Sequence, residues 1–261
     1  MSQTKPIIVL STDTLPGYWL DHIFDIAKDI GFDGIDLAMW KNFDAWNSKY
    51  VKKLVEQYKL PVRIIQTSPD VSAKEVQQAI MLAQEVKATV ISCNAPGYFN
   101  IKAFKMLEDW LVEWKKQFPE FQFSVITPDA SSMTLLPVLP KYRFASVVEI
   151  IKKYEAMVGL DTSHITEEAW DTMMLRKLEN MVPYISVVYM SDRDRAGHSH
   201  LPIGEGMLPL STFIQQLEKY SYAGMYSIKL ALNKKDLADP DKVAIYLKKC
   251  RDYILDHAVQ A

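Results

Sequence analysis

The sequence predicts a closed barrel of eight parallel strands covered by helices, the (β/α)8 or TIM barrel of the α/β class. Short apolar runs alternate with amphipathic helical segments eight times along the 261 residues. Most of these runs are continuously apolar, which is typical of parallel strands covered by helices. Eight units in this length favour a closed barrel over an open doubly wound sheet. The nucleotide-binding form of that open sheet needs a Gly-rich turn after its first strand, and none is present.

The predicted strands are short runs rich in Ile, Val, Leu and Phe. They span residues 6–12, 32–40, 61–67, 88–94, 121–127, 157–161, 185–192 and 225–232. The segments between them place apolar residues at the spacing of a helix that packs one face on a sheet. These helices span residues 19–31, 45–59, 73–86, 101–118, 146–154, 167–181 and about 210–220. With no linker, repeat or low-complexity stretch, residues 1–261 are predicted to form a single domain.

Two helix starts have specific capping signals. Ser72 and Glu75 form the pattern of a capping box that opens the helix at 73–86. Asp239 followed by Pro240 supplies an N-cap and a first-turn proline for a last helix.

Composition limits the classes of partner. The chain has 49% hydrophobic and 24% charged residues and a net charge of −2, so no basic field favours nucleic acid or an anionic membrane. It has only two cysteines, and its first apolar run is too short for a secretory signal. We therefore expect a cytoplasmic protein without nucleic-acid or membrane partners. The oligomeric state is left open, a homo-oligomer included.

In a TIM barrel the active site lies at the carboxyl ends of the strands. The polar and aromatic side chains expected there are Asp36, Trp40, Gln66, Cys93, Asn94, Thr127, Asp129, Asp161, His164, Tyr189, Asp192 and Lys229. The loop after the seventh strand adds Arg193, Arg195, His198, His200 and Glu205.

Five short motifs resemble one family of barrels. They are "GFDGIDL", "GLDTSH", "VVYMSD", "HLPIGEG" and "YSIKL", which follow one another in the strand order of the xylose isomerase-like barrels. That family includes sugar (phosphate) isomerases and epimerases and the endonuclease IV-type enzymes. The resemblance covers nearly the whole chain and implies a pocket for a carbohydrate-like small molecule at the mouth of the barrel.

The resemblance also implies a place for a divalent metal, which typical members hold with Glu, Asp, His and Glu from strands five to eight. Only Asp161 matches this set. Ile126 or Thr127 stands at the fifth-strand position, Tyr189 at the seventh and Lys229 at the eighth. Because an ammonium cannot ligate a cation and repels it, we expect no metal and no other cofactor. Lys229 is instead expected to neutralise Asp161.

The candidate catalytic residues are therefore Lys229, Asp161, His164 and Glu205, which supply positive charge and move a proton next to a carbonyl. The candidate substrate-binding residues are Tyr189, Asp192, His200, Gln66, Trp40 and Arg193. Structural alternatives stand beside these roles. Asp161 and His164 are also suited to capping the turn into the next helix, and Lys229 to a solvated or purely structural position.

Two functions follow. The first is a metal-free isomerase or epimerase of a sugar or sugar derivative. The alternative is a catalytically inactive barrel that serves as a sugar-binding or regulatory module, because a fold does not guarantee a function. A nucleic-acid repair role fits poorly, since the chain has only five histidines for a site that needs several metals.

Overall fold

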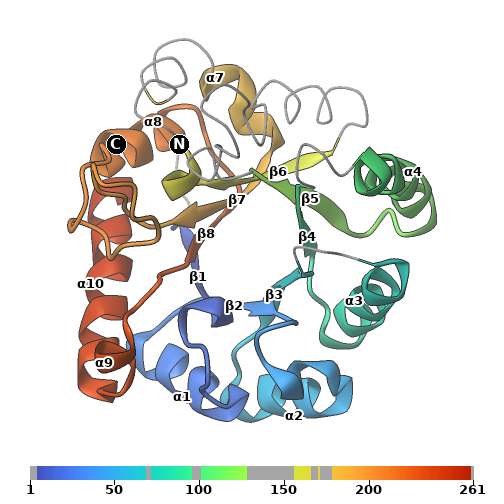
Figure 1. Cartoon of the computed structure of the whole chain (residues 1–261), viewed down its shortest axis with the longest axis horizontal. Helices are drawn as coiled ribbons and strands as arrows, with labels where there is room; N and C mark the ends of the chain where they lie inside the picture. The colour runs from blue at the N-terminus through green and yellow to red at the C-terminus, as the bar shows by residue number, and fades with distance from the viewer. Residues whose placement is uncertain are drawn as a thin grey trace.

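A computed structural model describes residues 5–68, 72–95, 101–127, 156–165, 170 and 178–259, of which 101–106 and 108 are described by their backbone alone. Eight parallel strands close into a barrel in chain order, which confirms the predicted fold (Figure 1). Ile7 pairs with Met225 where β1 meets β8 and closes the sheet. The strands are β1 Ile7–Ser11, β2 Gly34–Ala38, β3 Val62–Gln66, β4 Val90–Asn94, β5 Gln122–Ile126, β6 Met157–Asp161, β7 Ile185–Met190 and β8 Met225–Ile228.

Helices surround the barrel, and the long C-terminal helix packs beside the first one to complete the ring (Figure 1). They are α1 Leu20–Ile30, α2 Ser48–Tyr58, α3 Ala73–Val86, α4 Ile101–Gln117, α7 Leu178–Met181, α8 Leu210–Lys219, α9 Lys234–Leu237 and α10 Pro240–Val259. Short 3-10 turns follow the strands or precede them: η1 Thr12–Thr14, η2 Phe43–Trp46, η3 Thr162–His164 and η4 Val182–Tyr184. Each helix in the described ranges is too short or too polar to span a bilayer.

The predicted helix at 146–154 and most of that at 167–181 lie outside the described residues. The others are confirmed, and α9 was not predicted from the sequence. Strands β7 and β8 end earlier than predicted because the chain turns to bond with loops. Asp192 pairs with Leu201 in an isolated antiparallel bridge. Beyond Ile228, Leu230 N–H donates to Thr14 Oγ1 at 3.0 Å.

Both predicted helix starts are confirmed, but the capping box at α3 forms only one of its two hydrogen bonds. Ser72 Oγ accepts a hydrogen bond from Glu75 N–H at 3.3 Å, as a capping box requires. The Glu75 carboxylate, however, turns to Ser68, whose hydroxyl donates to it at 2.6 Å, and so ties β3 to α3 instead. At the last helix, Asp239 Oδ1 accepts from Lys242 N–H at 3.2 Å.

The core has two parts. A large apolar layer fills the space between the sheet and the helices, while a second cluster fills the barrel itself. The residues of this inner cluster are Val9, Ile64, Val90, Ile126, Val187, Tyr189 and Met225. Tyr189 is fully buried inside the barrel, and the lack of a side chain at Gly159 makes room for its ring. A Cβ at Gly159 would stand 2.9 Å from Tyr189 Cε2 and 3.2 Å from Ile126 Cγ1.

Gly159→Ala is therefore expected to overpack the barrel interior and lower the free energy of unfolding by about 1–3 kcal/mol. Urea denaturation followed by circular dichroism measures this loss. In a Tyr189→Leu background the ring carbon is absent, so the same substitution should cost much less. Equal losses in the two backgrounds would show that Tyr189 does not impose the glycine.

Candidate functional site

Five ionisable side chains meet at the carboxyl end of the barrel. Asp161 is the last residue of β6, and His164 ends the η3 turn that follows it. Lys229 comes directly after β8, Asp13 lies in η1 after β1, and His200 lies in the loop after β7. The closed sheet thus brings together residues that are far apart in the sequence.

The Asp161 carboxylate is fully buried and ionised. Ser163 N–H and the Ser163 hydroxyl both donate to Oδ1, at 3.2 and 2.9 Å. The other oxygen, Oδ2, has no hydrogen-bond partner among the described residues. Burial raises the pKa of this carboxyl, but His164, His200 and Lys229 together outweigh it and lower the pKa to about 2. Asp161 therefore caps η3 through one oxygen and presents the other to the Lys229 ammonium and the His164 imidazole.

Lys229 supplies the positive charge next to that free oxygen. Its Nζ lies 3.7 Å from Asp161 Oδ2 and 3.9 Å from Asp13 Oδ2, and 5.4 Å from the centre of the Tyr189 ring. These are ion-pair distances, and within the described ranges Nζ makes no hydrogen bond. Asp13 is held on its far side by Lys41, at 3.2 Å. Lys229 is only 8% exposed, but its ammonium keeps N–H groups that donate no hydrogen bond to the described residues.

The two histidines flank the carboxylate. His164 Nδ1 donates to the Thr127 carbonyl at 2.6 Å, and its Nε2 lies 3.6 Å from Asp161 Oδ2. His200 Nδ1 lies 3.1 Å from Ser163 Oγ and 3.2 Å from Ser191 Oγ. Burial lowers the pKa of His200 to about 4, so this ring is neutral at neutral pH.

The backbone of His200 adopts a left-handed conformation, with φ of 58°. Its carbonyl accepts a hydrogen bond from Ala231 N–H at 2.7 Å, which ties the loop after β7 to the segment after β8. A conformation that non-glycine residues seldom adopt is thus held by a tertiary hydrogen bond, and it directs the imidazole toward Ser163.

A layer of polar side chains lies inside the barrel at the level of Asp36. The Asp36 Oδ2 atom accepts from Gln66 Nε2 and from Ser227 Oγ, both at 2.6 Å. Four other buried atoms of this layer have no hydrogen-bond partner in the described part of the chain: Asp36 Oδ1, Gln66 Oε1, Ser92 Oγ and Tyr189 OH. Burial raises the pKa of Asp36 to about 7. Gln66 and Tyr189 thus lie in the barrel interior, beneath Lys229.

The loop residues predicted from the sequence take other positions. Asp192 Oδ1 accepts from Arg193 N–H at 2.8 Å and from Leu208 N–H at 3.0 Å, and Oδ2 accepts from Gly204 N–H at 3.0 Å. Its carboxylate therefore shapes the loop. Arg193 Nη1 donates to the Ser163 carbonyl at 3.2 Å, at the edge of the cluster.

Glu205 and Trp40 do not join the cluster. Glu205 is exposed beside α10, where its charge raises the pKa of Tyr246. Trp40, two residues past β2, is partly buried. Of the four predicted catalytic residues, the structure brings Asp161, His164 and Lys229 together and places Glu205 apart.

Sequence reasoning missed three participants. Asp13 is the second counter-charge of Lys229, and Ser163 and Ser191 hold His200. Asp13 had a usable signal, since it stands in "STDT" directly after the first strand, where side chains of the mouth are expected. The serines had no signal, because their contacts depend on the path of the loop after β7.

The carboxylate and the two imidazoles have the chemistry of metal ligands. One ligand atom each of Asp161, His164 and His200 lies within 4.8 Å of the others. A carbonyl accepting from His164 Nδ1–H is also the usual support of a metal-binding imidazole. The ammonium of Lys229, however, contacts the free oxygen of Asp161, where the positive charge of an ion would lie, and it repels a divalent cation. With Lys229 protonated, this set of residues does not fit a divalent metal.

Solved structures of other proteins share the fold. A xylose isomerase domain containing protein from Salmonella typhimurium LT2 is 17% identical, with a TM-score of 0.74 over 98% of this chain and 99% of that one. The 3-keto-D-glucoside 4-epimerase of E. coli is 16% identical, with a TM-score of 0.70 over 94% and 99%. The IOLI protein, solved with a zinc atom, is 12% identical, with a TM-score of 0.73 over 98% and 99%.

No family model matches the chain, and no curated protein matches it in sequence. At identities this low the structural likeness shows the fold. The expected resemblance to xylose isomerase-like barrels is confirmed at that level.

The raised pKa of Asp36 predicts a pH dependence of stability. Between its ordinary value of 3.8 and about 7 the folded chain holds a proton that the unfolded chain has released. Stability should therefore fall as the pH rises through this window, by on the order of 4 kcal/mol in total. Asp36→Asn, which resembles the protonated acid, should remove this slope. Urea denaturation at a series of pH values measures it.

The control is Asp25→Asn, on the exposed face of α1. The advantage of Asp36→Asn over the wild type should grow from pH 4 to 7 and level off above it. A slope that is the same in Asp36→Asn and in the wild type would assign the pH dependence to other groups.

Proposed function

We propose that the protein is an isomerase or epimerase of a sugar or sugar derivative, and that it works without a divalent metal. One observation carries the proposal. The free oxygen of the buried Asp161 lies 3.7 Å from Lys229 Nζ and 3.6 Å from His164 Nε2, at the end of the barrel where such folds place their active sites. A carboxylate, an ammonium and an imidazole thus face one small region.

The unpaired groups of this region complement an α-hydroxycarbonyl unit. Among the described residues, Asp161 Oδ2 accepts no hydrogen bond and Lys229 Nζ, although ion-paired, donates none. Because Asp161 Oδ2 is buried in the free protein, a substrate hydroxyl donates to it once it displaces the groups that cover this atom, while the neighbouring carbonyl oxygen accepts from Lys229 Nζ. Ketoses, aldoses in the open form and keto-sugars all contain this unit, and its two groups have opposite hydrogen-bonding needs.

The chemistry then follows from the charges. His164 Nε2 takes the proton from the carbon next to the carbonyl, and the C–H electron pair forms the C=C bond of an enediolate. The negative charge moves to the carbonyl oxygen, where Lys229 stabilises it. Asp161 stabilises the imidazolium that His164 becomes. Return of the proton to the neighbouring carbon, together with transfer of the hydroxyl proton to the former carbonyl oxygen, gives the isomer. Protonation of the original carbon on its opposite face gives the epimer and restores the carbonyl.

The solved structures of the same fold support this class of reaction, but they do not identify the substrate of this chain. One protein of the same fold is named for the 4-epimerisation of a 3-keto-glucoside. The absence of a metal is part of the proposal and rests on Lys229, whose ammonium supplies the charge that would stabilise the enediolate. A phosphorylated or acidic substrate has a further candidate partner in Arg193, which lies at the edge of the cluster.

Exchange of substrate hydrogen for solvent deuterium tests the proposal. A panel of aldoses, ketoses, keto-glycosides and sugar phosphates is incubated in D2O, and proton NMR follows the carbon next to the carbonyl. We expect exchange and turnover with at least one sugar, unchanged by a chelator. His164→Gln removes the base and Lys229→Met the positive charge, so each should lower kcat by roughly 100-fold or more.

The control is His198→Gln, because this histidine is exposed and pairs with Asp194 outside the cluster. It should retain full activity. Exchange that survives in His164→Gln would exclude the assigned base. Saturable sugar binding without exchange would instead favour the second candidate, a binding module.

Lys229→Glu tests the electrostatic argument against a metal. This change replaces the ammonium with a fourth potential ligand beside Asp161, His164 and His200, whose ligand atoms already lie together. We expect the variant to bind Zn2+ or Mn2+ at least 100-fold more tightly than the wild type, measured by isothermal titration calorimetry. Lys229→Met, which removes charge without adding a ligand, is the matched control. Tight metal binding by the wild-type chain would contradict the proposal.

A further inference from the structure

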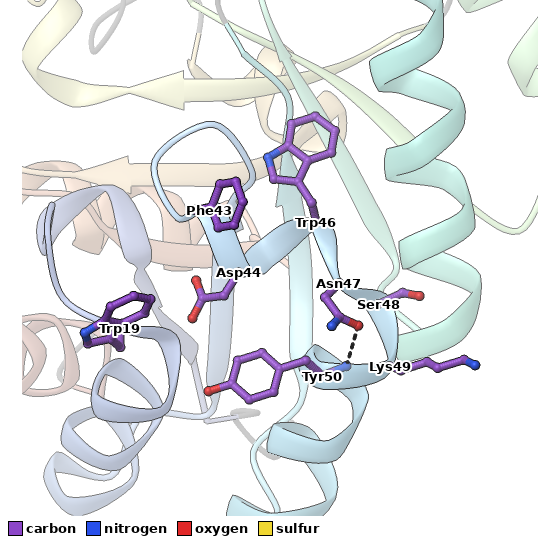
Figure 2. Close-up of a pocket in the computed structure, with 8 residues that line it drawn as sticks. All are labelled: Trp19, Phe43, Asp44, Trp46, Asn47, Ser48, Lys49 and Tyr50. Carbon is purple, nitrogen blue, oxygen red and sulfur yellow. Dashed lines mark hydrogen bonds between the residues drawn. The ribbon is translucent and has the colours of Figure 1, made fainter.

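An aromatic groove lies outside the cluster of ionisable residues. It is formed by the start of α1, by η2 and by the first turn of α2, and its volume is about 750 Å³ (Figure 2). Its lining residues are Trp19, Phe43, Asp44, Trp46, Asn47, Ser48, Lys49 and Tyr50. We propose that this groove binds the ring of a carbohydrate.

The aromatic side chains of the groove are exposed far beyond what packing requires. Phe43 is 92% exposed, Trp19 69% and Trp46 43%. Figure 2 shows Trp19 on one side of the groove and Phe43 and Trp46 on the other, with the Asp44 carboxylate between them. Large apolar groups gathered at one open site mark a binding surface. Flat aromatic rings suit the C–H faces of a pyranose.

Polar groups lie among these rings. Asp44 uses Oδ2 to accept from Leu20 N–H at 3.1 Å, and Asn47 uses Oδ1 to accept from Tyr50 N–H at 3.1 Å. Their other atoms, Asp44 Oδ1 and Asn47 Nδ2, make no hydrogen bond with the described residues. One is an acceptor and the other a donor, and both are fixed in place by the helix caps. Sugar hydroxyls, which donate and accept, match this pair.

The mixture of groups favours a sugar over a protein surface. The centre of a protein interface is depleted of charged residues, whereas Asp44 stands between the aromatic rings here. The groove is also on the catalytic end of the barrel, because η2 follows β2 and α1 follows η1. The Asp13–Lys41 ion pair connects that side of the mouth to the segment leading into η2. This binding site does not depend on the reaction proposed above.

Tryptophan fluorescence tests the groove, with cellobiose, maltose, lactose and methyl β-D-glucopyranoside as probes. We expect saturable quenching or enhancement with at least one probe. Trp46→Ala and Phe43→Ala should each weaken its binding by roughly tenfold, and Asp44→Asn should weaken it by less. Both aromatic residues are exposed, so circular dichroism should show unchanged folding. Tyr184→Ala is the matched control, since Tyr184 is 48% exposed and precedes β7 at the opposite end of the barrel.

The Lys229→Met variant distinguishes sugar binding in the groove from sugar binding at the mouth of the barrel. The titration should be unchanged in this variant even if turnover is lost, and groove binding should be detectable even if no sugar is a substrate. Lack of saturation with every probe, or equal affinity in Trp46→Ala and Tyr184→Ala, overturns the proposal. So does a concentration-dependent dimer that Phe43→Ala abolishes, because that result would assign the groove to a second copy of the chain.

Discussion

The ion pair between Asp161 and Lys229 is the constraint on which the rest of the site depends. A fully buried carboxylate is unfavourable by on the order of several kcal/mol unless charged and hydrogen-bonding partners compensate. Ser163 satisfies one oxygen and Lys229 neutralises the other. If either charge is removed, the other stays buried without this partner. The ion pair therefore requires a fixed distance between the end of β6, which holds Asp161, and the end of β8, which precedes Lys229. The fixed barrel maintains that separation.

The two buried carboxylates of the barrel show how the neighbours decide the state of one residue type. Asp36 accepts only from neutral groups, Gln66 and Ser227, and burial raises its pKa to about 7. Asp161 faces the Lys229 ammonium and two imidazoles, and its pKa falls to about 2. Near neutral pH the ammonium of Lys229 is therefore balanced chiefly by Asp161 and Asp13. Ionisation of Asp36 at higher pH adds a third negative charge below it.

The sequence was sufficient for what depends on period and strand order. Continuous apolar runs predicted the strands. Because the carboxyl ends of parallel strands lie on one face of the barrel, the strand order also predicted that Asp161, His164 and Lys229 lie close together. The sequence did not predict the positions of side chains that depend on the path of a loop. Glu205 lies in a motif that suggested the mouth, yet hydrogen bonds to Asp192 fold that loop so that Glu205 faces α10.

Tyr189 illustrates a further limit and its consequence. Strand order places it correctly on β7, but only the packing shows that its ring fills the barrel beneath Lys229, in space that Gly159 leaves open. A ring below and two carboxylates beside the ammonium leave the side toward the mouth for a ligand. In the proposed reaction a substrate meets Lys229 from that direction, with Asp161 and His164 beside it. For the proposed substrate, this geometry favours a small planar group such as a carbonyl with its neighbouring hydroxyl over a bulky ring centred on the barrel axis.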